Sequence, residues 1–162
     1  MVTKEAYRDA MARLGAAVNV VTTDGPGGKR GFTASAVCSV TDDPPTLLVC
    51  VNRINDTHTA LGQNGVLCIN TLSAGQAEIS AVFAGATGVE GEDRFNTGTW
   101  YALHSGAPVL QGAVVAFDCR IVQRTEIGSH TVFFAAVTAI QHGSVHDGLI
   151  YFGRGYHPVP AA

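Results

Sequence analysis

The chain has 162 residues, 46% of them hydrophobic, and this size and composition predict one domain, residues 1–162, with one sizeable core. The formal net charge is −3, and the 10 basic residues are scattered singly, which argues against a nucleic-acid partner. The charged N-terminus lacks the apolar core of a signal peptide, and no apolar run approaches the roughly 18 to 20 residues that cross a bilayer, so we expect a soluble, cytoplasmic protein without a membrane partner.

The first elements are predicted to be a helix and a strand. Tyr7, Met11, Leu14 and Val18 recur at helical spacing and indicate an amphipathic helix over residues 5–18. The β-branched run over residues 17–23 predicts a strand, and the glycine-rich segment that follows predicts a hairpin turn.

The second strand is predicted to run over residues 31–40. Its alternation places one set of side chains on one face, namely Phe32, Ala34, Ala36, Cys38 and Val40, and a set rich in hydroxyls on the other, including Thr33, Ser35, Ser39 and Thr41. Pro44 and Pro45 end this strand, and apolar runs over residues 46–52 and 66–72 predict two more.

The second half of the chain is predicted to contain a further helix, a long loop and three more strands. Ser73 and Gln76 have the spacing of a capping box, which predicts a helix over residues 74–84. Residues 85–112 are rich in glycine and form a long loop, and strand patterns return at residues 113–122, 130–140 and 148–152. Six or seven strands at short spacing, with two or three short helices and no βαβ alternation, favour a mainly β fold, an antiparallel barrel.

The four cysteines, Cys38, Cys50, Cys68 and Cys119, lie in apolar segments and have no C-x-x-C spacing. This placement favours reduced, buried thiols over a disulfide or a zinc site. G-x-S-x-G and H-E-x-x-H motifs are also missing from the sequence, so it offers no hydrolytic nucleophile and no recognisable metal centre. Redox chemistry carried by a cofactor needs neither.

Residues 31–57 carry the most informative pattern for a binding site. Thr33, Ser35, Asn55 and Thr57 could donate hydrogen bonds to phosphate oxygens, Arg53 could supply the countercharge, and a helix beginning near Thr57 would direct its N-terminus at the anion. The same residues are equally compatible with half-buried strand hydroxyls and an Asp56 that only caps the helix.

Several segments together resemble the short-chain flavin reductases of two-component monooxygenases, and the resemblance runs nearly end to end. They are RDAMARLGAAVNVVTTDGPGG, GFTASAVCSVTDDPPTLLVCVNR, VLCINTLSAGQ, GSHTVFF and GLIYFGRGYHP. The resemblance is strongest to the reductases of pyrimidine catabolism and of 4-hydroxyphenylacetate 3-monooxygenase, followed by a corrin reductase of cobalamin synthesis.

What the resemblance implies is a homodimeric, FMN-binding split β-barrel with two sets of site residues. The implied flavin contacts are Thr33, Ala34, Ser35, Ala36, Ser39, Val40, Thr41, Val51, Asn52, Arg53, Asn55, Thr57, Phe83, Ala84 and Gly85. The residues implied to border the nicotinamide are Gly128, His130, Arg154, Tyr156 and His157. Asn55 and Asp56 stand where relatives often place a serine, and a carboxylate near a phosphate would be repulsive unless it faces away.

The implied activity is reduction of FMN, or of FAD, by NADH or NADPH. Hydride would pass from C4 of the nicotinamide to N5 of the flavin at about 3 to 3.5 Å, with His130 orienting the dinucleotide or stabilising charge. Reduced flavin would then diffuse to a flavin-dependent monooxygenase. Two alternatives stay open: a reductase that keeps its FMN and reduces another acceptor such as a cobalt corrin, and a flavin-binding module without enzymatic activity.

Overall fold

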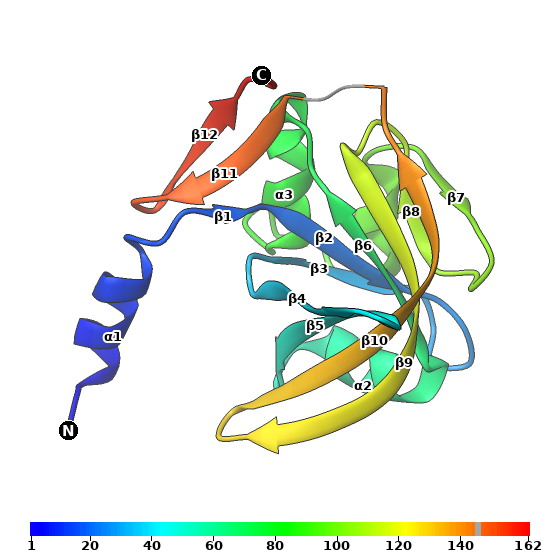
Figure 1. The fold of residues 1–162 in the computed structure, drawn as a ribbon, viewed down its shortest axis with the longest axis horizontal. Helices are drawn as coiled ribbons and strands as arrows, with labels where there is room; N and C mark the ends of the chain where they lie inside the picture. Colours follow the sequence, from blue (N-terminus) through cyan, green and yellow to red (C-terminus); the bar gives the residue numbers. More distant parts are fainter. Residues whose placement is uncertain (145–146) are drawn as a thin grey trace.

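A seven-stranded antiparallel sheet forms the body of the protein in a computed structural model that describes residues 1–144 and 147–162. The strands coil around a shared interior, as Figure 1 shows. In sheet order they are β3 (Arg30–Ala34), β2 (Asn19–Thr23), β6 (Val66–Thr71), β9 (Val115–Ile127), β10 (His130–His142), β5 (Pro45–Asn52) and β4 (Val37–Asp42). The edge strands β3 and β4 follow each other in sequence, and the sheet ladder does not join them within the described chain. The predicted split barrel is therefore confirmed.

Two smaller sheets and short helices surround this body. β1 (Ala16–Ala17) pairs with β11 (Gly148–Phe152), which forms a hairpin with β12 (Gly155–Val159), and β7 (Trp100–Ala102) pairs with β8 (Pro108–Leu110). The α-helices are α1 (Lys4–Met11), α2 (Asp56–Asn64) and α3 (Ala77–Phe83), and the 3-10 helices are η1 (Ala74–Gln76) and η2 (Gly91–Asn96). No helix in the described ranges is both long and apolar enough to cross a membrane.

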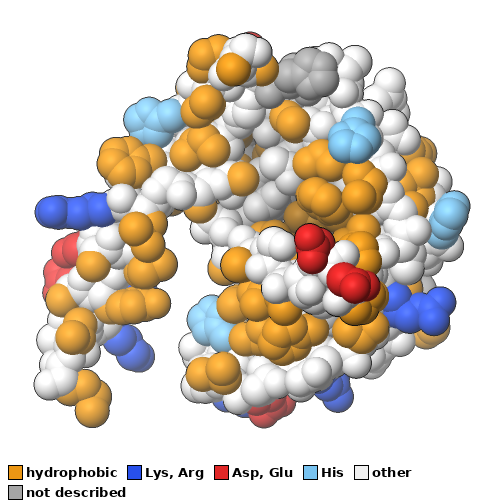
Figure 2. All heavy atoms as spheres, viewed as in Figure 1, with side chains coloured by type: hydrophobic (Ala, Val, Ile, Leu, Met, Phe, Trp, Pro, Cys, Tyr) orange, Lys and Arg blue, Asp and Glu red, His pale blue; other side chains and the backbone are white. Residues whose placement is uncertain are grey.

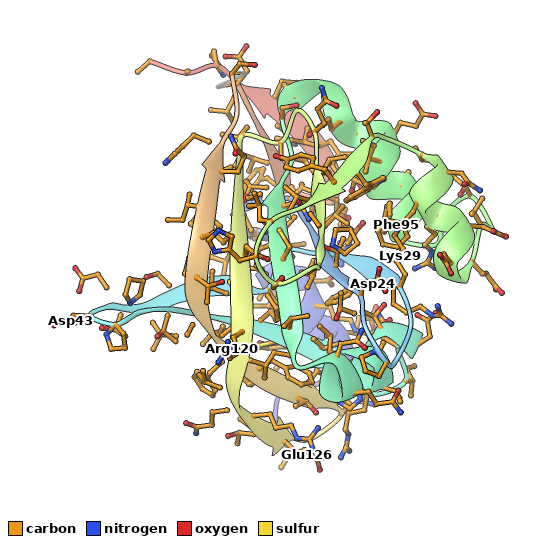
Figure 3. The ribbon with its side chains drawn as sticks, turned by 90° about the vertical axis from the view of Figure 1, so that its right-hand side faces the viewer. Asp24, Lys29, Asp43, Phe95, Arg120 and Glu126 are labelled. Carbon is orange, nitrogen blue, oxygen red and sulfur yellow. The ribbon has the colours of Figure 1, made fainter. Side chains whose placement is uncertain are left out.

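Two apolar clusters hold these elements together. Inside the barrel, the inward-facing residues of the strands, among them Val21, Val49 and Phe133, pack on Leu61 of α2. Beneath α3, the rings of Phe83, Phe95 and Trp100 pack with centroids 5.0 to 5.3 Å apart. The Lys29 ammonium lies 4.9 Å from the centre of the Phe95 ring, and Figure 3 shows the two side chains next to each other. The aromatic cluster fixes η2 to the sheet.

The predicted helix over residues 5–18 is shorter than its apolar periodicity suggested. It begins after Thr3, whose Oγ1 accepts a hydrogen bond from the N–H of Ala6, and ends at Met11. Beyond Gly15 the backbone of β1 pairs with β11, so sheet pairing outcompetes the continuation of the helix. The α1 helix has no buried residue.

The prediction of one strand over residues 31–40 was wrong, because the chain turns at Ser35 and Ala36 and divides it into β3 and β4. The alternation therefore does not continue: Phe32 is buried in the barrel, whereas Cys38 and Val40 are exposed on β4. The expectation that all four thiols are buried is wrong for Cys38, which is exposed, and for Cys50, which is half-buried, although all four cysteines are free.

The remaining predicted elements differ mainly in number and extent. The helix over residues 74–84 is realised as η1 followed by α3, and the Oε1 of Gln76 accepts the N–H of Ser73 as a capping box requires. The glycine-rich segment over residues 85–112 contains η2, β7 and β8 rather than only loop. Twelve strands in the described chain thus replace the six or seven expected, because short pairings such as β1 and β7 carry little periodic signal.

Candidate functional site

The N-terminus of α2 follows directly from the end of β5 and is capped by Asn55. Its side-chain Oδ1 accepts a hydrogen bond from the N–H of Thr57 at 3.0 Å, and the Oδ1 of Asn52 accepts one from the N–H of Ile54 at 3.2 Å. These bonds fix the turn between strand and helix, whose first N–H groups carry partial positive charge. The predicted helix near Thr57 is confirmed, but its cap is Asn55 and not Asp56.

The carboxylate of Asp56 lies beside this helix N-terminus and is partly neutralised. Its Oδ2 is 3.5 Å from the Nε of Arg30, and both side chains are partly exposed. Exposed ion pairs of this kind contribute little to the stability of the fold. The effect of this pair is on the charge around the helix N-terminus. Arg30 offsets the negative charge that Asp56 would otherwise present to an anion bound at the helix.

A cavity of about 430 Å³, here called the α2 cavity, opens between this helix N-terminus, β3 and the C-terminal end of α3. Four predicted site residues meet in its lining, namely Thr33, Asn55, Phe83 and Ala84. The other lining residues are Phe32, Ile54, Asp56, Glu90 and Arg94. The lining combines polar and charged groups with the apolar side chains of Phe32, Phe83 and Ala84. This mixture suits a ligand with an anionic end and an apolar body.

The wall of the cavity formed by α3 is held in place by a hydrogen bond from a β3 side chain to the helix backbone. The Oγ1 of Thr33 donates to the carbonyl of Ser80 at 2.6 Å and so joins β3 to α3. After Phe83, whose ring is buried in the aromatic cluster, the chain leaves the helix through Gly85 with φ of +79°. Glycine adopts that left-handed conformation without steric cost, and the turn brings Ala84 to the cavity.

Arg94 was not assigned to the site by sequence, because it lies in the segment predicted to be a loop. Its guanidinium reaches back from η2 and donates from Nε to the carbonyl of Val89 at 3.0 Å. Its Nη1 donates to the carbonyls of Gly31 and Phe83 at 3.1 and 3.4 Å. These bonds place a permanently charged group in the wall of the α2 cavity. The only sequence signal was a lone arginine before a buried aromatic residue.

A second hollow, the N-terminal groove, lies between α1, the turn from β3 to β4, and the β11–β12 hairpin, with a volume of about 560 Å³. Ser35, Ala36 and Arg154, all predicted site residues, are in its lining. The side chains of Tyr7, Met11 and Leu14 give the helix side of the groove its apolar character. Figure 2 shows α1 standing away from the body with an open hollow beside it.

A third group of predicted residues gathers at the turn between β9 and β10. Arg53 donates from Nη1 to Glu126 at 3.0 Å and from Nη2 to the carbonyl of Gly128 at 2.6 Å. His130 lies opposite Asn52 in the β5–β10 ladder, and its Nδ1 is 2.9 Å from the hydroxyl of Ser129. Arg53 and His130 line neither the α2 cavity nor the N-terminal groove, so the structure does not bring Arg53 to the helix N-terminus.

Two of the three predicted residues of the β11–β12 hairpin contact other parts of the chain, and His157 contacts the hairpin itself. Arg154 pairs with Asp9 of α1, and the hydroxyl of Tyr156 lies 2.7 Å from that of Ser80 in α3. The Nε2 of His157 lies 3.0 Å from the carbonyl oxygen of Phe152. The hairpin therefore links α1 to α3.

The other predicted flavin contacts lie on β4 or in the core. Ser39, Val40 and Thr41 are exposed on the edge strand β4, whereas Ala34 and Val51 face the barrel interior, and Thr57 is buried in the first turn of α2. Because the side chains of Ala34 and Val51 are buried, a ligand could contact only the backbone at these two positions. The predicted set is thus divided among the α2 cavity, the N-terminal groove and the surface between them.

Residues 11–160 match the family model described as flavin reductase like domain. The chain belongs to this flavin reductase-like family. It is also 58% identical over 158 residues to the FMN reductase (NADH) RutF of Ancylobacter novellus, an alignment that covers 98% of this chain and 86% of the relative.

Solved structures agree with the assignment to the flavin reductase-like family. A candidate flavin reductase from Haemophilus somnus superposes with a TM-score of 0.93 at 42% identity, covering 98% of this chain and 100% of the other. The styrene monooxygenase flavin reductase of Pseudomonas putida S12 gives a TM-score of 0.84 at 27% identity, covering 96% and 98% of the two chains. This chain therefore shares its fold, over nearly its whole length, with these two reductases.

Proposed function

We propose that this flavin reductase-like protein catalyses the reduction of FMN by NADH and supplies the reduced flavin to a partner flavin-dependent monooxygenase. The observation that carries the proposal is the α2 cavity, whose lining combines a capped helix N-terminus, the fixed guanidinium of Arg94 and apolar side chains such as Phe83. The relative named as an NADH-dependent FMN reductase supports the reaction, and the styrene monooxygenase reductase supports the flavin-supply role.

The residues present fit FMN by the chemistry of their donors. The N–H groups at the start of α2, with Asn55 and Thr57, would hold the phosphate end, as anions bind at helix N-termini. From there a flavin can extend along β3 toward Ser35 and Ala36 at the N-terminal groove, so that one ligand would contact both hollows. Thr33, Phe83 and Ala84 would border its middle part. FAD, the other flavin considered, would need additional room for its adenosine.

When bound, FMN supplies the redox chemistry, because its ring accepts two electrons from a reduced nicotinamide. The protein then needs no acid or base of its own; its residues bind, orient and exclude water. In this proposal His130, with Gly128 and the hairpin residues Arg154, Tyr156 and His157, borders the nicotinamide. His130 is exposed and can donate a hydrogen bond to the dinucleotide.

A homodimer is part of the same proposal. Tyr7, Met11 and Leu14 are all exposed on the N-terminal segment, although their apolar side chains are suited to burial. An isolated helix as short as α1 is unstable in water, so a second copy seated in the N-terminal groove would account for it. The groove contains Ser35 and Ala36, so the partner copy would also enclose the flavin.

The test is oxidation of NADH followed at 340 nm with FMN, FAD or riboflavin, and with NADPH in place of NADH. We expect flavin-dependent turnover with FMN and NADH, and transfer of the reduced flavin to an added flavin-dependent monooxygenase. Tightly bound FMN that is reoxidised only by a cobalt corrin would favour a retained-flavin reductase. Flavin binding without any NADH or NADPH oxidation would contradict the proposed enzyme and support a binding module.

The role of His130 is tested by the variant His130→Ala. We expect the KM for NADH to rise by about 10-fold, the size of one lost hydrogen bond to a charged ligand, with the Kd for FMN nearly unchanged. His142→Ala, at the opposite end of β10, is the matched control. An unchanged KM for NADH would remove His130 from the nicotinamide site.

A further inference from the structure

The strand β9 extends beyond the strand that pairs with it on one side. β6 pairs with β9 from Val115 to Arg120, whereas β9 continues to Ile127. On that side of residues 122–127, no strand of the described chain pairs with β9. In an antiparallel strand, the N–H and C=O groups of alternate residues point to opposite sides. Residues 122–127 therefore present backbone donors and acceptors at a free edge, which is a template for another strand.

The chain turns away from this edge immediately before β6 begins. Gly65 ends α2 with φ of +69°, and its carbonyl accepts a hydrogen bond from the N–H of Ile121 at 2.9 Å. β6 then starts at Val66. The place beside β9 that a longer β6 would fill is therefore left open by the strands of the described chain. Arg120 and Glu126 mark the two ends of this part of β9 in Figure 3.

A hollow of about 240 Å³, here called the edge groove, lies along the free edge. Residues 121–124 of β9 line one side, and Leu61, Gly62 and Gly65 line the other, together with Phe133 of β10. Leu61 and Phe133 have no exposed surface, so they form an apolar base. The two glycines carry no side chain, which lets a peptide backbone approach closely. A strand edge beside a hollow for side chains is the geometry by which sheets bind extended peptides.

The charged side chain in the described lining of the edge groove is Arg124. No carboxylate of the described chain lies within salt-bridge distance of it. Glu126, two residues later on β9, is already paired with Arg53 at 3.0 Å. A Cβ added to Gly62 would stand 2.9 Å from Nη1 of Arg124, so the guanidinium lies against α2 at the groove. Its planar fork of donors matches a carboxylate.

We propose that the edge groove binds an extended segment of a partner protein that carries an aspartate or a glutamate. The segment adds as a strand to residues 122–127, places a small apolar side chain over Leu61 and Phe133, and pairs its carboxylate with Arg124. A small anion could bind Arg124 but could not use the backbone groups of the edge. The edge groove shares no lining residue with the α2 cavity or the N-terminal groove, so this inference does not rest on the proposed function.

The experiment selects octapeptides from a random phage-displayed library on the purified protein and measures the Kd of the enriched peptides by fluorescence anisotropy. We expect these peptides to alternate small apolar and polar residues and to share an aspartate or a glutamate. Arg124→Gln should weaken their binding by about 10-fold or more, the size of a lost charge-assisted hydrogen bond. Arg120→Gln is the matched control, because Arg120 is exposed on the same strand outside the groove lining, and it should leave the Kd unchanged.

A change in the peptide separates strand addition from simple charge attraction. Methylation of the backbone nitrogens at alternate peptide residues removes the donors that face β9, and we expect it to weaken binding by as much as Arg124→Gln does. Methylation at the residues in between, whose N–H groups point away from β9, should change the Kd little. This series uses only the wild-type protein, so it remains decisive even if Arg124→Gln does not fold.

Four outcomes would overturn the inference. They are the absence of acidic residues from the enriched peptides, equal binding by the wild type and Arg124→Gln, equal effects of the two methylation patterns, and self-association of the wild type that Arg124→Gln abolishes. The last outcome would assign the edge to a second copy of the chain. NADH oxidation with FMN should be the same for the wild type and Arg124→Gln, since Arg124 lines neither the α2 cavity nor the N-terminal groove. A wild type without NADH oxidation would count against the proposed function and leave the peptide measurements valid.

Discussion

The segment over residues 85–112 and the helix α1 both extend away from the seven-stranded sheet, but only the first is bound to it by buried contacts. Asn70 of β6 accepts the N–H of Leu110 at 2.7 Å and donates to the carbonyl of Pro108 at 3.3 Å. The carboxylate of Asp118, fully buried in β9, accepts the N–H of Ser105 at 2.8 Å. In contrast, α1 contains no buried residue.

This difference separates a segment that buried contacts within one chain hold in place from a helix that has no buried residue in its own chain. Hydrogen bonds in a water-free interior fix the relative positions of the segments that they join. Loss of one partner costs folding free energy, because the other polar group stays buried without a hydrogen bond. The segment over residues 85–112 thus has a fixed position and can carry Arg94 to the α2 cavity. Within the described residues, α1 and the turn after it are held by the exposed ion pair of Asp9 with Arg154 and by a bond from the N–H of Gly153 to the carbonyl of Ala12. The exposed apolar side chains of α1 are those that the proposed second copy would cover.

The largest expected effect is loss of the buried bonds of Asn70. Asn70→Ala leaves the N–H of Leu110 without its side-chain acceptor, at a cost of about 1 to 3 kcal/mol for one unsatisfied buried group. The carbonyl of Pro108 loses one donor but keeps the hydroxyl of Thr22 as a second. We expect urea denaturation to show a fall of about 2 kcal/mol in the free energy of unfolding. Asn96→Ala, an exposed position in η2, is the control. If the two variants are equally stable, the side-chain hydrogen bonds of Asn70 do not hold the segment over residues 85–112 to the sheet.

A smaller effect is expected at α1, where a substitution should lower the affinity of the proposed dimer without changing the stability of the fold. Met11→Asp places a charge in the N-terminal groove, and burial of such a side chain contributes about 1.5 to 3 kcal/mol, so dimer affinity should fall by about 10-fold or more. Sedimentation velocity over a range of concentrations measures this. Ala10→Asp introduces the same side chain on the same helix outside the groove lining and should leave the dimer intact. A wild-type protein that stays monomeric at all concentrations would contradict the proposed role of α1 as a dimer contact.

The smallest perturbation compares the thiol of Cys68, which the segment over residues 85–112 covers, with the exposed thiol of Cys38 on β4. Desolvation, followed by the charge of Asp118, raises the pKa of Cys68, which lies beneath Ala107 and Val109, and raises that of Cys119 to about 12. The reactive thiolate is therefore scarce at pH 8, and we expect an aromatic disulfide reagent to modify exposed Cys38 first. Cys38→Ser should remove the fast phase. Equally fast modification of Cys68 would show that the segment over residues 85–112 opens readily.

The same thiols predict the direction of stability at high pH. Their pKa values are higher in the folded protein than the 9.0 of an unperturbed thiol, so the unfolded state loses these protons first. Stability is then complete below about pH 9 and falls as the pH rises above it. Urea denaturation between pH 8 and pH 10 measures the slope.

The sheet was predictable where one local pattern decided the outcome. Strands such as β6 are apolar along their length because both faces are covered, and Asn55 with Thr57 marks the start of α2 because short polar side chains cap helices. The periodicity of residues 5–18 and 31–40 was misleading, because pairing of β1 with β11 and the turn at Ser35 depend on chain segments far away. No local pattern encodes such contacts.

The candidate site shows the same division. Thr33 and Asn55, both suggested by the sequence patterns of β3 and α2, line the same α2 cavity. Arg94 could not be found from those motifs, since three carbonyls from separate segments determine where its guanidinium lies. By sequence Arg53 was equally suitable as a countercharge for a phosphate. In the structure its guanidinium pairs with Glu126, which lies 73 positions later in the chain.

The two edges of the sheet, β3 and β4, are held together at one end by the covalent link through Ser35 and Ala36. From Ala34 to Val37 the chain can span at most about 10 Å, which sets an upper limit on the width of the barrel there. Farther along, no ladder crosses between these strands in the described chain. Widening the gap between β3 and β4 therefore breaks no hydrogen bond of the sheet ladder in the described chain, whereas separating any other pair of neighbouring strands in this sheet would break several.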